Sequence, residues 1–266
     1  SLKDLLEAGC HFGHKVEKWH PKAASFIYGA REGIHIIDLA KTRDGLKSAV
    51  EFIHNLGKEG KIVLFVATKR QSKGIVSEAA KRAVLPYLTN RWVGGFLTNW
   101  EEVKKNINKL NRMGKELTEG VWKKFPKHEQ VKLEKDMHKL DAVYGGVKEL
   151  SKLPDAVFVI DIKREISCLK ETKRCVIPTV AIIDTNADPN MVDYPIPAND
   201  DAVGSIQYIV DVLAEAYIEG KKVMEKREVK EQITNNKEQK TEDKREDIKE
   251  DKEEKRKKKR SPKKLK

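Results

Sequence analysis

Long apolar runs and paired cysteines are both missing from this chain of 266 residues. No apolar run approaches the roughly 20 residues of a membrane-spanning helix, so we expect no membrane partner. Cys10, Cys168 and Cys175 form no CxxC pair and no even set, which favours a reducing compartment. The opening residues 2–7 are too short and too acidic for a secretory signal peptide.

Signatures of enzymes and of standard metal sites are missing as well. The sequence contains no GxxxxGK or GxGxxG phosphate-binding motif. Cys10, His11, His14 and His20 lie near one another, but their spacing matches no standard zinc site. We therefore expect no catalytic residues, no metal ligands and no small-molecule substrate.

Charge is plentiful and unevenly distributed. The net charge is +12 and the pI is about 9.4, which favours a polyanionic partner, nucleic acid before a membrane surface. Residues 221–266 hold 20 basic and 12 acidic residues, so they contribute +8 and leave +4 for residues 1–220. RNA binding by the folded part must therefore come from local patches.

Short apolar runs alternate with helical patterns along much of the chain. Buried runs rich in β-branched residues predict strands, and the alternation favours a parallel sheet covered by helices on both faces. We interpret Thr42 and Asn199 as helix N-caps. The predicted strands are 34–38, 62–68, 156–161 and 179–184, with weaker ones at 26–28, 87–89 and 194–196, and the predicted helices are 42–56, 71–83, 165–175 and 200–219.

Residues 99–150 interrupt this alternation. Apolar residues recur at a 4-3-4-3 spacing from Val103 to Leu117 and again from Leu133 to Val147. A natural reversal lies between the two stripes. Two heptad-spaced helices joined by a turn predict an antiparallel coiled-coil hairpin that also leans on the sheet.

The apolar periodicity stops at Lys221. We expect residues 221–266 to form a disordered or frayed Lys/Glu-rich tail, because they cannot bury enough apolar area to offset chain entropy. Residues 255–266 carry nine basic and no acidic residues, which favours salt-sensitive contact with phosphates; a solvated tail without a partner is the alternative. The predicted organisation is a sheet domain (1–98 and 151–220), an inserted hairpin (99–150) and this tail.

Two basic segments are suited to RNA. Between His11 and Lys22, rings could stack on bases while lysines meet phosphates, although ordinary loop histidines are the alternative. Lys69 and Arg70 follow a predicted strand, where α/β sheets commonly bind ligands. A phosphate of RNA fits there better than a bound nucleotide.

The run from Arg91 to Trp100 combines a glycine pair with three aromatic residues just before the hairpin. Glycine allows a sharp turn or a close backbone approach, and the aromatic residues suit a packed hinge. We expect Trp92, Phe96 and Trp100 to serve mainly in packing. Arg91 and Asn99 are expected to reach outward.

Carboxylates gather between Asp184 and Asp201, after another predicted strand. Grouped carboxylates at strand ends could hold Mg²⁺ or act as acid and base. The sequence around them contains no partner nucleophile and no histidine. Because Asn, Asp and Pro are also ordinary turn residues, we favour turn formation and helix capping here.

Eight ordered stretches carry a resemblance to a known family: 5–14, 19–22, 34–39, 65–69, 91–100, 153–156, 183–189 and 196–202. Together they resemble the S2 family of bacterial-type small-subunit ribosomal proteins, from about residue 2 to residue 220. The resemblance implies a flavodoxin-like parallel sheet with helices on both faces, an inserted coiled-coil hairpin, and no catalysis.

The chain is therefore interpreted as a structural protein of the small ribosomal subunit that supports translation. The resemblance implies binding to 16S-type ribosomal RNA between head and body, contacts with neighbouring ribosomal proteins, and help in docking the large mRNA-binding one. It leaves bacterial cytoplasm and an organelle open as locations, and no cofactor is expected beyond structural Mg²⁺ at RNA contacts. The expected RNA-binding residues are His11, His14, Lys15, Lys18, Trp19, His20, Lys22, Arg31, Lys69, Arg70, Arg91, Trp92 and Asn99.

Two rival classes stay open from the sequence. One is an enzyme that uses the loops between Asp184 and Asp201 for Mg²⁺-dependent chemistry on a phosphorylated small molecule. The other is a coiled-coil scaffold with an incidental α/β base. Co-migration with small subunits on a sucrose gradient would separate our interpretation from both.

Overall fold

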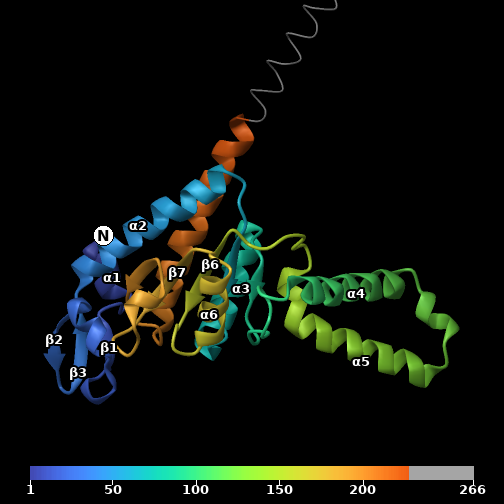
Figure 1. Cartoon of the computed structure of the whole chain (residues 1–266), viewed down its shortest axis with the longest axis horizontal. Coiled ribbons are helices and arrows are strands. Elements are labelled where there is room, and N and C mark those ends of the chain that lie inside the picture. The colour runs from blue at the N-terminus through green and yellow to red at the C-terminus, as the bar shows by residue number, and fades with distance from the viewer. Residues whose placement is uncertain (228–266) are drawn as a thin grey trace, which may run out of the picture. The chain divides into compact units, whose positions relative to one another are not determined.

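The computed structural model describes residues 1–227, and residues 1–221 form one compact unit (Figure 1). Residues 222–266 are a second unit, of which residues 222–227 are described and helical. The prediction for the tail therefore lies almost wholly outside the described residues. Among residues 1–227, no helix combines the length and the apolar character needed to cross a membrane.

A five-stranded parallel sheet forms the centre of residues 1–221. Counted along the chain, its strands lie in the order 2-1-3-4-5, one of the two common doubly wound arrangements. All residues of β4, β6 and β7 are buried, as expected for strands covered on both faces. In spatial order the strands are β5 (Tyr87–Leu88), β4 (Val63–Val66), β6 (Ala156–Ile160), β7 (Thr179–Ile183) and β8 (Tyr194–Pro197).

Helices cover both faces of this sheet, which confirms the predicted layering. On one face, Phe65 and Phe158 pack with α2 (Leu39–Lys58), α3 (Arg70–Ala83) and the helix that begins at residue 203. On the other face, Val66 and Val159 pack with residues of α6 (Ile166–Arg174) and of the first half of α4 (Trp100–Thr118). Alternate residues of each strand thus enter separate apolar clusters.

A separate three-stranded antiparallel sheet precedes the parallel one, and it corrects two predictions. The strand predicted at 34–38 is β3 (Ile34–Ile37) and pairs here rather than in the parallel sheet. Its neighbour β1 was not predicted as a strand, because it is short and carries no alternation of apolar residues. The remaining elements of this region are α1 (Leu2–Glu7), β1 (Phe12–Lys15), η1 (Val16–Lys18), η2 (Pro21–Phe26) and β2 (Ile27–Arg31).

Two helices, α4 and α5 (Lys127–Tyr144), separate β5 from β6 and pack side by side in opposite directions (Figure 1). They are joined through η3 (Val121–Lys124), and η4 (Gly145–Val147) leads back to the sheet. Val103 and Ile107 of α4 are buried in the same cluster as sheet residues, whereas Leu117 is 41% exposed. The base of the pair therefore leans on the sheet, and a coiled coil along its full length stays a prediction.

Neither predicted N-cap stands at the start of its helix. Asn199 lies four residues before the helix that begins at residue 203, and its side-chain oxygen accepts from the amides of Asp201 and Ala202 at 2.7 and 2.8 Å in the preceding turn. The other helix begins earlier than predicted, with Asp38 accepting from the amide of Ala40 at 2.9 Å. The prediction for Thr42 is therefore wrong; this buried residue lies inside α2 and its hydroxyl donates to backbone carbonyls.

Two glycines allow α2 to approach the helix that begins at residue 203. A Cβ added to Gly57 would lie 2.5 Å from the carbonyl oxygen of Tyr217. A Cβ added to Gly220 would collide with the carbonyl oxygen of His54. The backbones of the two helices are therefore in direct contact at this point, with no room for a methyl group.

A polar site at the carboxyl ends of the parallel strands

Polar side chains follow four of the five parallel strands. Lys69 follows β4, Asp161 follows β6, Asp184 follows β7 and Asp200 follows β8. Because the strands are parallel, their carboxyl ends meet at one edge of the sheet, where doubly wound proteins usually place their sites. The fold thereby gathers residues as far apart in sequence as Lys69 and Asp200, which are separated by 131 positions.

The ammonium group of Lys69 lies among three carboxylates. Its Nζ is 2.8 Å from Asp200, 2.7 Å from Asp201 and 3.3 Å from Asp161. The Lys69 side chain is only 11% exposed, and that of Asp200 is 3% exposed. Lys69 was predicted to meet an RNA phosphate, but here its charge is engaged inside the protein.

The buried charges shift one another's pKa. Burial lowers the pKa of Lys69, but the charge of Asp200 and the hydrogen bonds that Lys69 donates to Asp200 and Asp201 outweigh it, so this pKa lies above its ordinary value. Burial, reinforced by the charges of Asp184 and Asp161, raises the pKa of Asp200 to about 7, although Lys69 opposes the rise. Ionised Asp200 is therefore held in the fold at a cost.

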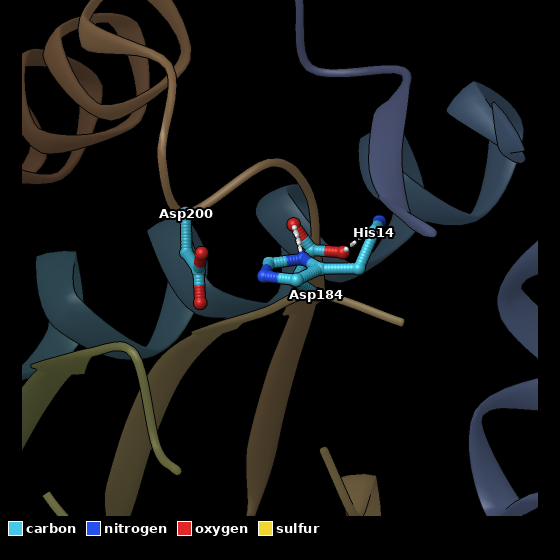
Figure 2. Close-up of side chains that lie close together, drawn as sticks. All are labelled: His14, Asp184 and Asp200. Carbon is cyan, nitrogen blue, oxygen red and sulfur yellow. Dashed lines mark hydrogen bonds and ion pairs between the residues drawn. The ribbon is translucent and has the colours of Figure 1, made fainter. Parts of the chain in front are cut away.

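His14 of β1 extends this cluster from the small antiparallel sheet. Figure 2 shows its imidazole against the carboxylate of Asp184. The distance from His14 Nδ1 to that carboxylate is 3.1 Å. The other ring nitrogen lies 3.5 Å from Asp201. The hydrogen bond to Asp184 raises the pKa of His14 above its ordinary value, although burial opposes this. The inference that no histidine neighbours the Asp184–Asp201 carboxylates is therefore wrong.

Backbone contacts fix the N-terminal region to the same strand ends. The amide of His14 donates to the Thr185 hydroxyl at 3.0 Å, and the amide of His20 donates to the Thr185 carbonyl at 2.8 Å. Gly13 permits this approach, because a Cβ there would lie 2.8 Å from the Thr185 methyl group. Lys22 adds an ion pair to Asp188 at 2.6 Å. The antiparallel sheet is thus held against the parallel one.

Three residues of the cluster could hold a divalent cation. His14, Asp184 and Asp200 each offer one ligand atom within 4.8 Å of the others (Figure 2). Asp184 and Asp200 are both buried. Imidazole and carboxylate together form a donor set that Zn²⁺ and similar cations accept. The spacing argument that predicted no metal ligands did not anticipate this combination.

Most of the predicted RNA-binding residues fall into two groups, and Lys69 and Arg70 lie outside both, at the start of α3. The first belongs to the antiparallel sheet and its loops, where Lys15, Lys18 and Trp19 are exposed while His14 is turned inward. The second lies before α4, where Arg91 and Asn99 are exposed as predicted. Of the other predicted residues, His11 and His20 are half-buried, and Lys22, Arg31 and Arg70 are exposed. Trp92 is half-buried, and its indole N–H donates to Glu171.

The hinge interpretation of the run from Arg91 to Trp100 agrees with the packing. Phe96 is fully buried, with its ring centroid 5.3 Å from that of Trp92 and 5.9 Å from that of Trp100. The sequence reasoning missed the acceptor that this run requires, Glu171 of α6. No signal in the sequence marks it, because a glutamate in an amphipathic helix resembles any solvent-facing one.

Fold and site together define a doubly wound α/β protein with a buried ionic cluster at its strand ends, against which an antiparallel N-terminal sheet is held. A sequence model of the family described as "Ribosomal protein S2" matches residues 5–220. The chain belongs to the ribosomal protein S2 family.

Several relatives cover most of the chain. "Small ribosomal subunit protein uS2" of Coprothermobacter proteolyticus is 48% identical over 221 residues, 83% of this chain and 82% of the relative. The protein of the same name from Desulfatibacillum aliphaticivorans is 46% identical over 85% of this chain and 77% of its own length. "Small ribosomal subunit protein uS2c" of Mesostigma viride is 45% identical over 84% of this chain and 97% of its own length. These matches support a structural role in the small ribosomal subunit and in translation.

Proposed function

We propose that this chain binds 16S-type ribosomal RNA with the exposed surface of its N-terminal region and stands between the head and body of the small subunit. One observation carries the proposal: Lys15 and Lys18 are exposed and form no ion pair within residues 1–227. Beside them Trp19 is 41% exposed, which leaves part of its ring for stacking on a base. The contacts to Thr185 and Asp188 hold this surface in place.

Lys69 has a different role in this proposal. Its ammonium stabilises the strand-end loops through three carboxylates and is not offered to RNA. Arg70 begins α3 next to it, is exposed, and forms no ion pair among the described residues. Arg70 is therefore the better candidate of the pair for a phosphate, since guanidinium matches phosphate geometry.

The same burial argues against the enzyme alternative. An Mg²⁺-dependent enzyme needs carboxylates that face a substrate, but Asp184 and Asp200 are buried and already engage His14 and Lys69. Buried charges that are paired and hydrogen-bonded suit a structural role. A cation held by these residues would stabilise the N-terminal region, and Mg²⁺ at the RNA surface is a separate expectation.

Protein partners complete the proposal. We infer that the chain contacts neighbouring small-subunit proteins and helps to dock the large mRNA-binding one, as the family resemblance implies. The helix pair of residues 99–150 suits such contacts, because its far end keeps Leu117 and Val131 exposed. We propose that the pair is a short coiled coil at this end and that the protein works on ribosomes in the cytoplasm.

The RNA contact is tested by replacing both lysines. We expect Lys15→Ala with Lys18→Ala to weaken binding to small subunits depleted of this protein about tenfold, because two phosphate contacts are lost. The slope of log affinity against log salt should fall by about 2. Filter binding over a salt series measures both quantities.

Lys47→Ala with Lys58→Ala is the matched control. Both residues are exposed on α2, away from the proposed surface, and replacing them removes the same amount of charge. This control should leave both the affinity and the salt slope nearly unchanged. Equal losses in the two double variants would mean that only net charge matters, and the proposed surface would be wrong.

A further inference from the structure

One carboxylate on α6 collects hydrogen bonds from a segment 73 to 79 positions earlier in the chain. Glu171 Oε1 accepts from the indole N–H of Trp92 at 3.0 Å and from the amide of Gly95 at 2.8 Å. Its Oε2 accepts from the amide of Leu97 at 2.9 Å, and from the amide and hydroxyl of Thr98 at 3.4 Å. Glu171 lies inside α6 and therefore does not cap its own helix.

The amides bound by Glu171 belong to a loop that has few other acceptors for them. Gly95, Leu97 and Thr98 precede the start of α4 at Trp100, so they make no helical hydrogen bond of that helix. The backbone turns at Gly95, whose φ is +83°, and Phe96 anchors the loop in the core. Partly buried amides need an acceptor, and one carboxylate supplies it for those of Gly95 and Leu97, while it also accepts from the exposed Thr98.

The conformation of this loop also sets the positions of Arg91 at one end and of Asn99 and the start of α4 at the other. Arg91 at the beginning is exposed and forms no ion pair within residues 1–227. At the other end, Asn99 is exposed and α4 begins one residue later. A conformational change in the loop would therefore move an exposed guanidinium and the start of the helix pair together.

We propose that Glu171 is a positioning residue: it holds residues 92–98 in the conformation that presents Arg91 to a phosphate of ribosomal RNA. The proposal rests on the RNA-binding function proposed above. A carboxylate accepts stronger hydrogen bonds than a neutral oxygen does. Arg91 forms no ion pair within residues 1–227, so its guanidinium can make a bidentate contact with phosphate. Glu171 itself touches no RNA in this arrangement.

The test uses the full chain with Glu171→Gln, Arg91→Ala and both together. Glutamine keeps the size of the side chain but replaces one acceptor oxygen with a donor that faces the loop amides. We expect the amides of residues 95–98 to exchange hydrogen at least tenfold faster in Glu171→Gln. Affinity for small subunits depleted of this protein should fall up to about tenfold in each single variant, and the double variant should bind no more weakly than Arg91→Ala alone.

Glu51→Gln, an exposed glutamate of α2, is the matched charge control and should change neither quantity. Trp92→Phe keeps an aromatic ring and removes one donor to Glu171, so it should give a smaller change in the same direction. It serves as the readout if Glu171→Gln does not fold.

Two results would overturn the proposal: additive losses of affinity in the double variant, or an Arg91→Ala variant that binds normally. The second result leaves the RNA-binding function standing if the Lys15 and Lys18 variant still binds weakly. If that variant also binds normally, the RNA-binding function fails as well. In either case the amide exchange rates show whether Glu171 stabilises the loop, independently of RNA binding.

Discussion

Lys69→Met is expected to lower the free energy of unfolding by about 3 kcal/mol or more at neutral pH, because it leaves buried carboxylates without their cation. Methionine keeps most of the side-chain volume, so the loss reports charge rather than a cavity. Asp161 and Asp200 would then face each other's charge with little access to solvent. Urea unfolding in the presence of a chelator measures the loss without interference from bound cations.

The raised pKa of Asp200 makes the stability of the protein depend on pH. The pKa of Asp200 is raised to about 7 in the fold, against about 3.9 in an unfolded chain. The folded state thus binds more protons between these values, so stability from this group is greatest at low pH and falls as pH rises towards 7. Without Lys69 the opposing interaction is gone, so the pKa of Asp200 should rise further and the fall should continue to higher pH.

Two further variants separate the charge effect from other causes. Lys69→Met combined with Asp200→Asn should recover much of the lost stability, since one uncompensated charge is removed. Lys47→Met, at an exposed site of α2, should change stability by less than about 0.5 kcal/mol. A Lys69→Met variant as stable as the parent at pH 7 would contradict the ion cluster.

Gly220→Ala is expected to destabilise the protein by about 1 to 3 kcal/mol, the usual range for overpacking. The added methyl group would meet the carbonyl oxygen of His54 and approach the backbone of Gly57, so α2 must move away. Alanine has the higher helix propensity by about 1 kcal/mol, which opposes the loss. The cost of the clash exceeds the gain in helix propensity, because the added methyl group meets backbone atoms rather than a flexible side chain.

Gly114→Ala is the matched control for this prediction. Gly114 is also helical, in α4, and a Cβ there would meet nothing within 4 Å. Only the propensity term remains, so this variant should be more stable by up to about 1 kcal/mol. Thermal unfolding of both variants tests the pair, and a Gly220→Ala variant as stable as Gly114→Ala would rule out the close helix crossing.

The layered core could be read from the sequence because its strands are buried on both faces. The predicted strands 62–68, 156–161 and 179–184 contain β4, β6 and β7, whose continuous apolar runs leave little alternative. The run at 34–38 was also predicted as a strand, although His35 interrupts it, and it joined the antiparallel sheet. Apolar runs indicate burial but do not encode which strand is the neighbour, and that limit explains the error.

The site was harder to predict because its partners are distant in sequence. Lys69 was placed correctly at a strand end, but nothing local indicates that Asp161 and Asp200 would neutralise it. His14 was assigned to an RNA-facing segment because β1 was not recognised as a strand. Once β1 is placed against the loop after β7, the contact of His14 with Asp184 follows from geometry.

The insertion of the helix pair between β5 and β6 has a consequence for the order of folding. The amide of Ile62, just before β4, donates to Asp155, just before β6, across 93 positions of the chain. Closing so long a loop costs entropy before the strand contacts can offset it, whereas α4 and α5 meet through local contacts. The helix pair can therefore form first and shorten the search by which the two central strands find each other.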